Sequence, residues 1–173
     1  MTAVRHRLTV LVLVGLVAAA CTSDSVNPKQ EAIGLIEGEL ADQAALGPLA
    51  AACPDAEDVE AGGSFECTGT TGDGQVVRFT AEVTDDGAGE IVSTNLLTPE
   101  DIPTLADDAA TVLAEQNDLE PAPMTCDDSS GFVIEQGAVL DCELTDPATG
   151  DMLGATITIT DPVNVGYTVE LKP

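Results

Sequence analysis

Two cysteine-bounded stretches decide the fold of this chain, CPDAEDVEAGGSFEC at 53–67 and CDDSSGFVIEQGAVLDC at 126–142. Each stretch has an apolar residue two positions before its second cysteine, Phe65 in the first and Leu140 in the second. An acidic residue directly precedes that cysteine, and a turn rich in glycine and aspartate follows it. This shared pattern indicates an internal repeat, so we expect the two halves of the chain to fold alike.

The repeat also predicts how the cysteines pair. Four cysteines allow three connectivities, and the repeat favours pairing within each copy, which gives Cys53–Cys67 and Cys126–Cys142. Each disulfide closes a loop whose constraint is worth about 3 kcal/mol in the chain-entropy model. The alternative, redox-active or metal-binding cysteines, lacks both a C-x-x-C spacing and a histidine partner.

The first 20 residues have the pattern of a signal peptide. Arg5 and Arg7 form a positive start, an apolar run follows from Leu8, and small residues precede Cys21. The apolar run is shorter than the roughly 20 residues needed to span a bilayer, which weakens the alternative of a membrane anchor helix.

The segment Ala18-Ala19-Ala20-Cys21 resembles a bacterial lipoprotein lipobox. The resemblance implies that residues 1–20 are a lipoprotein signal peptide and that Cys21 carries lipid. Residues 21–27 would then be the lipidated cysteine and a polar tether. The expected location is the extracytoplasmic face of the cell membrane, with the lipid on Cys21 as the membrane contact.

Each half is predicted to begin with a helix. Asn27 can cap a helix that starts at Pro28 and runs to about Ala51. Thr98 can cap a second helix, with Pro99 at its first position. The apolar faces expected from helical spacing are Ile33, Ile36, Leu40 and Ala44 in the first helix, and Ile102, Leu105, Ala109, Val112 and Leu113 in the second.

After each helix the apolar pattern alternates with a period of two, which is typical of strands. The alternating segments are 76–83 and 153–159, with closing strands at 91–97 and 167–171. The predicted fold class is therefore α+β, with two tandem repeats at 28–97 and 98–173. Each repeat is one helix packed on a three- to four-stranded antiparallel sheet, with one disulfide per repeat.

The charge restricts the possible partners. The chain has 31 acidic and 5 basic residues, a net charge of −26. Removal of residues 1–20 would leave three basic residues, a charge of −28, and no histidine, because His6 is the single one. Nucleic acid is excluded as a partner, because its binding needs cationic side chains to replace counterions.

The same composition leaves little catalytic chemistry. Nucleophilic catalysis needs a positioned base, usually histidine, so we expect no catalytic residue, no metal site and no cofactor. The acidic stretches 85–90 and 127–128 do not fit an EF-hand loop and suit turns better than calcium sites. A pair of catalytic carboxylates remains as an alternative.

The pattern Cys53-Pro54, then Gly62-Gly63-Ser64-Phe65-Glu66-Cys67, resembles a family of secreted and lipoprotein domains, mostly actinobacterial, that carries a domain-of-unknown-function label. The second copy matches more loosely, because Asp127 replaces the proline. This resemblance implies a fold and no activity. In architecture alone, two tandem stapled repeats are similar to the β-lactamase inhibitory protein, and such a likeness does not transfer function.

The leading functional hypothesis is a non-enzymatic cell-envelope lipoprotein, anchored at Cys21, that binds an envelope protein or a small ligand. The alternative is an inhibitor or modulator of a secreted or envelope enzyme. Such a modulator would present its acidic turns or its outer sheet faces to a basic partner. The outer-face residues are Arg78, Glu82, Thr156 and Thr158.

Overall fold

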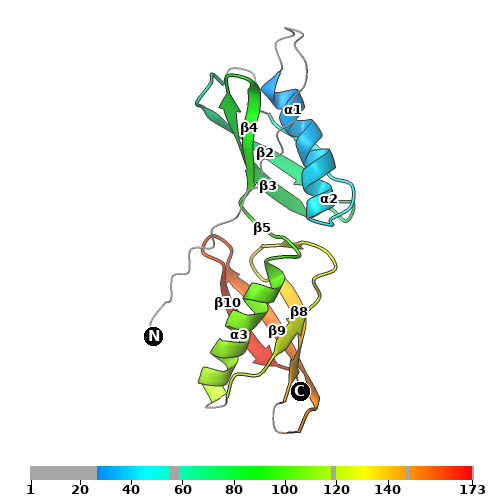
Figure 1. Cartoon of the computed structure of the whole chain (residues 1–173), viewed down its shortest axis with the longest axis vertical. Coiled ribbons are helices and arrows are strands. Elements are labelled where there is room, and N and C mark those ends of the chain that lie inside the picture. The colour runs from blue at the N-terminus through cyan, green and yellow to red at the C-terminus, as the bar shows by residue number, and fades with distance from the viewer. Residues whose placement is uncertain (1–26, 55–58, 118–119, 147–148, 173) are drawn as a thin grey trace.

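The computed structural model describes residues 27–54, 59–117, 120–146 and 149–172. The chain forms two lobes stacked along its long axis (Figure 1). Each lobe has a four-stranded antiparallel sheet, ordered β1-β2-β3-β4 in the first and β6-β8-β9-β10 in the second. Taken along the chain, the two orders are the same, which is consistent with two repeats. The predicted α+β class with antiparallel sheets is confirmed.

The elements have the following bounds. The first lobe contains α1 (Pro28–Leu35), η1 (Ile36–Leu40), α2 (Ala41–Gln43), β1 (Ala50–Ala52), β2 (Ser64–Thr70), β3 (Val76–Thr84), β4 (Gly87–Ser93) and β5 (Leu96–Leu97). The second contains α3 (Ile102–Asn117), β6 (Met124–Cys126), β7 (Phe132–Val133), β8 (Val139–Thr145), β9 (Met152–Asp161) and β10 (Gly166–Leu171).

The first helical region begins as predicted and ends earlier. Asn27 caps it, because its side-chain oxygen accepts a hydrogen bond from the backbone N–H of Lys29 (3.0 Å). The region ends at Gln43 instead of Ala51. Ala45 and Gly47 have positive φ angles, which turn the chain out of the helix and toward strand β1.

The first helical region is also not one regular helix, because its middle segment, η1, is π-helical. A π turn adds a residue, so the buried face steps from Ile36 to Ala41 instead of to Leu40, which is only partly buried. The predicted single helix of this repeat is therefore matched in part. No atom lies within 4 Å of a Cβ built on Gly34 or Gly38, so these two helical glycines do not mark a close contact.

The second helix, α3, starts at Ile102, three residues later than predicted. Residues 98–101 form a turn that leads into it. The Asp101 carboxylate accepts hydrogen bonds from both the backbone N–H and the hydroxyl of Thr98, at 2.9 and 2.6 Å. The predicted helix face is buried except for Val112, which is partly buried.

The helices hold their sheets differently. In the first lobe, Glu31 accepts a hydrogen bond from the N–H of Ala88 on β4 (2.8 Å). Glu37 accepts one from the N–H of Ala51 on β1 (3.0 Å). One helical region thus forms hydrogen bonds with both edge strands of the sheet. In the second lobe, α3 packs against its sheet through a face of small and aliphatic side chains, four of them buried alanines.

Two separate hydrophobic cores lie between helix and sheet. The predicted alternation is confirmed in β3, where Val77, Phe79, Ala81 and Val83 are all buried. In β9 the same alternation buries residues 155, 157 and 159, while Leu153 is 38% exposed at the end of the strand.

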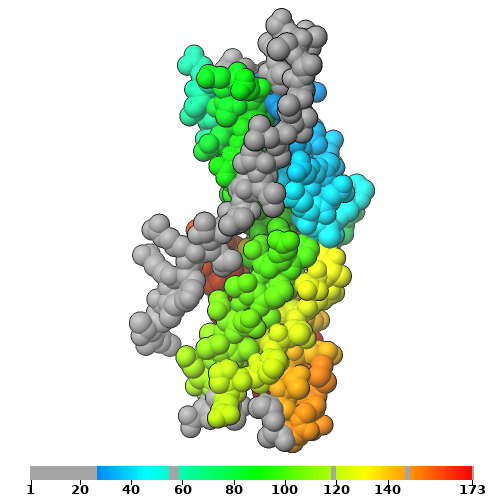
Figure 2. Space-filling model, viewed as in Figure 1, coloured from blue at the N-terminus to red at the C-terminus, as the bar shows by residue number. Residues whose placement is uncertain are grey.

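A two-stranded ribbon joins the lobes, and the sequence did not predict it. Strand β5 pairs with β7, Leu96 opposite Val133 and Leu97 opposite Phe132. The side chains cross over: Val133 packs in the core of the first lobe, and Leu97 packs in the core of the second. Figure 2 shows the lobes in contact at this waist, with the cyan end of the first helical region against the yellow segment of the second lobe.

Candidate functional site

Both predicted disulfides are present. Cys53 follows β1 directly and joins Cys67 on β2, with the two Cα atoms 4.2 Å apart. Cys126 on β6 lies directly opposite Cys142 on β8, with the Cα atoms 4.0 Å apart. Each disulfide therefore links the short edge strand of its sheet to the neighbouring central strand.

The two disulfides differ in exposure. Cys53 and Cys67 are 2% and 1% exposed, inside the first core. Cys142 is buried too, but Cys126 is partly exposed at the sheet edge. The second disulfide also borders a surface depression, which makes this region the candidate site.

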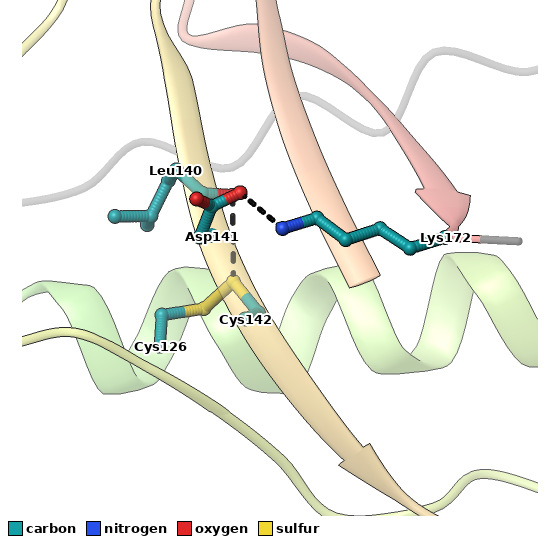
Figure 3. The surroundings of a disulfide bond; sticks show 5 residues. All are labelled: Cys126, Leu140, Asp141, Cys142 and Lys172. Carbon is teal, nitrogen blue, oxygen red and sulfur yellow. Dashed lines mark hydrogen bonds and ion pairs between the residues drawn. A yellow bond between two sulfur atoms is a disulfide. The ribbon is translucent and has the colours of Figure 1, made fainter. Parts of the chain in front are cut away.

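The depression has a volume of about 430 Å³ and lies beside β6, β8 and β9. Its lining residues are Thr125, Cys126, Asp127, Asp141, Cys142, Glu143, Gly154 and Lys172. Figure 3 shows the Lys172 side chain extended toward Asp141, on the other side of β8 from the disulfide. The Lys172 ammonium nitrogen is 2.6 Å from an Asp141 carboxylate oxygen.

Gly154 allows the lysine to lie there. A Cβ atom built on Gly154 would be 3.1 Å from Cδ of Lys172 and 3.2 Å from its Cβ. Because β9 lies between β8 and β10, the lysine crosses a strand to reach Asp141, and a side chain at 154 would push it away. The Lys172–Asp141 ion pair therefore depends on the absence of a side chain at position 154.

The charge of the depression is negative. Three acidic residues, Asp127, Asp141 and Glu143, line it together with one lysine, which pairs with Asp141. Hydrogen bonds from the side chain and the backbone N–H of Ser129 hold the pKa of Asp127 below its ordinary value. The depression thus suits a cationic group better than an anion.

The residues predicted to face a basic partner do not come together in one sheet. Arg78 and Glu82 lie on the exposed side of β3, and Thr156 and Thr158 lie partly exposed on β9. The structure therefore places two of them on each lobe.

The acidic stretches considered for calcium are turns. Asp85 and Asp86 form the turn between β3 and β4. The backbone N–H of Ser129 donates to Asp127 (3.0 Å), as is typical of an Asx turn. Within the described residues, no group of three or more potential ligands is arranged to hold a metal ion.

The predicted signal peptide at 1–20, the lipidation site Cys21 and the tether up to residue 26 lie outside the described residues. Among the helices of the described part of the chain, none combines the length and apolarity needed to cross a membrane.

Sequence reasoning missed two features of this protein. Asn95 is 3% exposed and bonds the backbone of β3, accepting from the N–H of Arg78 (2.7 Å) and donating to the carbonyl of Val76 (2.9 Å). Asn95 is the last of three consecutive polar residues, Ser93 to Asn95, and no sequence pattern marked it as buried. Nothing in the sequence pattern placed Lys172 beside Asp141.

The fold and its two disulfides define an α+β protein of two similar lobes. A domain of unknown function (DUF4333) is found at residues 11–87, a range that includes the first disulfide and strands β1 to β3. No curated protein and no solved structure matches the chain.

Proposed function

We propose that this protein is a non-enzymatic lipoprotein of the bacterial cell envelope, anchored by lipid on Cys21 and acting as an extracytoplasmic binding module. The observation that carries the proposal is the pair of disulfides in a chain whose first 21 residues resemble a lipoprotein signal. Disulfides persist in oxidising compartments outside the cytoplasm, and the signal supplies the route there.

The tether length adds an orientation. Helix α1 starts at Pro28, so residues 22–27 separate it from the anchor. Six residues span at most about 20 Å, which keeps the first lobe near the membrane. The second lobe, with the acidic depression and an open sheet face, would then be the part that a partner meets.

The lipid anchor is tested by the mass of the mature protein. Intact-mass and N-terminal peptide analysis of the membrane fraction should show a chain that begins at Cys21 and carries diacylglycerol. A Cys21→Ser variant should lose the lipid and its membrane association, whereas the control Ser23→Ala should keep both. A wild-type chain that begins elsewhere and carries no lipid would contradict the proposal.

The binding role is tested by partner capture. Cross-linking in intact cells, followed by purification in detergent, should recover a partner with a basic surface, and the complex should weaken as salt rises. Glu143→Lys reverses a charge on the exposed face of the second sheet and should reduce recovery of the partner. Glu115→Lys on the exposed side of α3 should change recovery less. If both variants reduce partner recovery equally, the partner does not bind the exposed sheet face of the second lobe.

The second candidate, modulation of a secreted or envelope enzyme, draws on the same face. Val139 and Met152 are 52% and 58% exposed at its two ends. Apolar side chains around charged residues are usual at protein interfaces. An enzyme among the captured partners, with activity altered by the purified protein, would favour this function over simple binding.

A further inference from the structure

The two inter-cysteine loops have different roles in the fold. The loop of the second lobe, residues 127–141, makes contacts that cross the waist. The Gly131 N–H donates to the carbonyl of Ala44 (2.6 Å), and the Ile134 N–H donates to the backbone carbonyl of Asn95 (2.7 Å). This loop also carries β7, which pairs with β5 and places Val133 in the first core.

The approach at Gly131 is too close for a side chain. A Cβ atom at this position would lie 2.7 Å from the carbonyl oxygen of Ala44. The loop is thus a clasp (residues 127–141) that holds the first lobe through backbone hydrogen bonds and one buried valine. The Cys126–Cys142 disulfide closes the two ends of the clasp.

The disulfide at the base of the clasp is also the more accessible one. Cys126 is partly exposed on an edge strand, and the disulfide borders the 430 Å³ depression. In contrast, both cysteines of the first disulfide are at most 2% exposed. Thiol–disulfide exchange requires a thiolate to reach a sulfur atom, so the second disulfide should react first.

We propose that Cys126–Cys142 is a reducible site that controls the contact between the two lobes, and that a dithiol reductant with a neutral or cationic surface acts on it. One thiolate of the reductant attacks a sulfur of the disulfide and forms a mixed disulfide. The other cysteine leaves as a thiolate and takes up a proton. The second thiol of the reductant then displaces the first cysteine, so two electrons pass to the protein and the reductant becomes a disulfide.

The surrounding charges define which reductant fits. Asp127, Asp141 and Glu143 line the same depression. Their carboxylates repel an anionic thiol and attract a cationic one, and salt screens both effects. The first disulfide lies in an apolar core, where access limits every thiol alike.

The first experiment measures which disulfide opens. The full-length chain in detergent is treated with cysteamine, a cationic thiol, or with 2-mercaptoethanesulfonate, an anionic one, and free thiols are alkylated and mapped by mass spectrometry. Cys126 and Cys142 should be alkylated at least about tenfold faster than Cys53 and Cys67, because access to sulfur limits exchange. Cysteamine should react faster, and high salt should reduce its advantage. Equal alkylation rates for the two disulfides would overturn the proposal. So would a ratio of the cysteamine rate to the 2-mercaptoethanesulfonate rate that does not change with salt.

The second experiment measures what the reduction releases. Amide hydrogen exchange is compared before and after alkylation of Cys126 and Cys142. The amides of Gly131 and Ile134 should exchange at least about tenfold faster, as expected when a local unit opens. Those of β2 and β3 in the first lobe should keep their protection. Unchanged exchange at Gly131 and Ile134 would show that the disulfide does not control the clasp.

A variant separates the clasp from the disulfide. Val133→Ala should speed hydrogen exchange at the amides of Gly131 and Ile134 while both disulfides stay intact. Val139→Ala, on the exposed side of β8, should leave their exchange unchanged. If alkylation of Cys126 and Cys142 removes protection from both lobes together, the disulfide holds the whole fold and the proposal is wrong. None of these readouts depends on lipid at Cys21, so failure here leaves the proposed anchor standing.

Discussion

The two lobes have the same strand order, yet different interactions hold their edge strands in place. In the first lobe, Glu31 and Glu37 reach from the helical region to backbone N–H groups on β4 and β1. In the second, α3 lies against the sheet through buried alanines. The same topology is therefore compatible with a helix that hydrogen-bonds to the edge strands or with one that only packs against the sheet. Four changes test how far the lobes differ.

Loss of a disulfide should have the largest effect on stability. Replacing Cys53 and Cys67 together by alanine should lower the free energy of unfolding by about 3 kcal/mol, as expected for a loop of this length. Urea denaturation measures the loss. The matched change at Cys126 and Cys142 should cost about as much, since the separations are 14 and 16 residues. A loss under about 1 kcal/mol for the first pair would mean that its buried setting compensates for the missing bond.

Asn95→Ala should have the next largest effect. The change leaves the Arg78 N–H and the Val76 carbonyl without their partner in a buried setting. We expect a loss of about 2 kcal/mol, because each unsatisfied buried group costs about 1–3 kcal/mol. Thermal and urea unfolding measure it. Asn164→Ala, in an exposed turn of the second lobe, serves as the control and should change stability by less than about 0.5 kcal/mol.

Glu31→Ala tests the edge contact directly. The Ala88 N–H loses a charged acceptor, which should cost about 1 kcal/mol at this partly buried position. Amide exchange at Ala88 should rise at the same time. Glu115→Ala on the exposed side of α3 should have almost no effect on stability. A null result for Glu31 would mean that strand pairing and packing hold β4 without this hydrogen bond.

The smallest effect is a pH dependence confined to the second lobe. Burial and, to a lesser degree, the charge of Asp108 raise the pKa of Tyr167 above 10.0. The folded state therefore keeps the phenol proton at a pH where the unfolded chain releases it. Stability should then be unaffected below pH 10 and fall as pH rises above it. Tyr167→Phe should flatten this fall in chemical denaturation, and an unchanged slope would contradict the assignment.

Much of the fold could be predicted from local patterns. The alternation in 76–83 and the cysteine spacing are local patterns, so β3 and both disulfides lie where expected. The predicted closing strand 91–97 is instead divided between β4 and β5, which belong to different sheets. The π turn at Ile36–Leu40 could not be anticipated from a 3.6-residue period, because it is a one-residue departure from that period.

The candidate site was less predictable, because it depends on contacts between distant residues. Lys172 and Asp141 are 31 positions apart and meet only because Gly154 leaves room between their strands. The ribbon of β5 and β7 pairs two-residue segments, too short to give a periodic signal. The cysteine spacing located the disulfides, while the exposure of Cys126 followed from its position on an edge strand.

The exchange of Val133 and Leu97 across the waist bears on the order of assembly. A chain is made from its N-terminus, and domains generally fold in that order. Here the first lobe lacks a core residue until position 133 has been synthesised, because Val133 belongs to its core. The first lobe is therefore completed only after α3 and β7 of the second lobe have been made. A chain that stops before position 133 would leave the first core without this side chain.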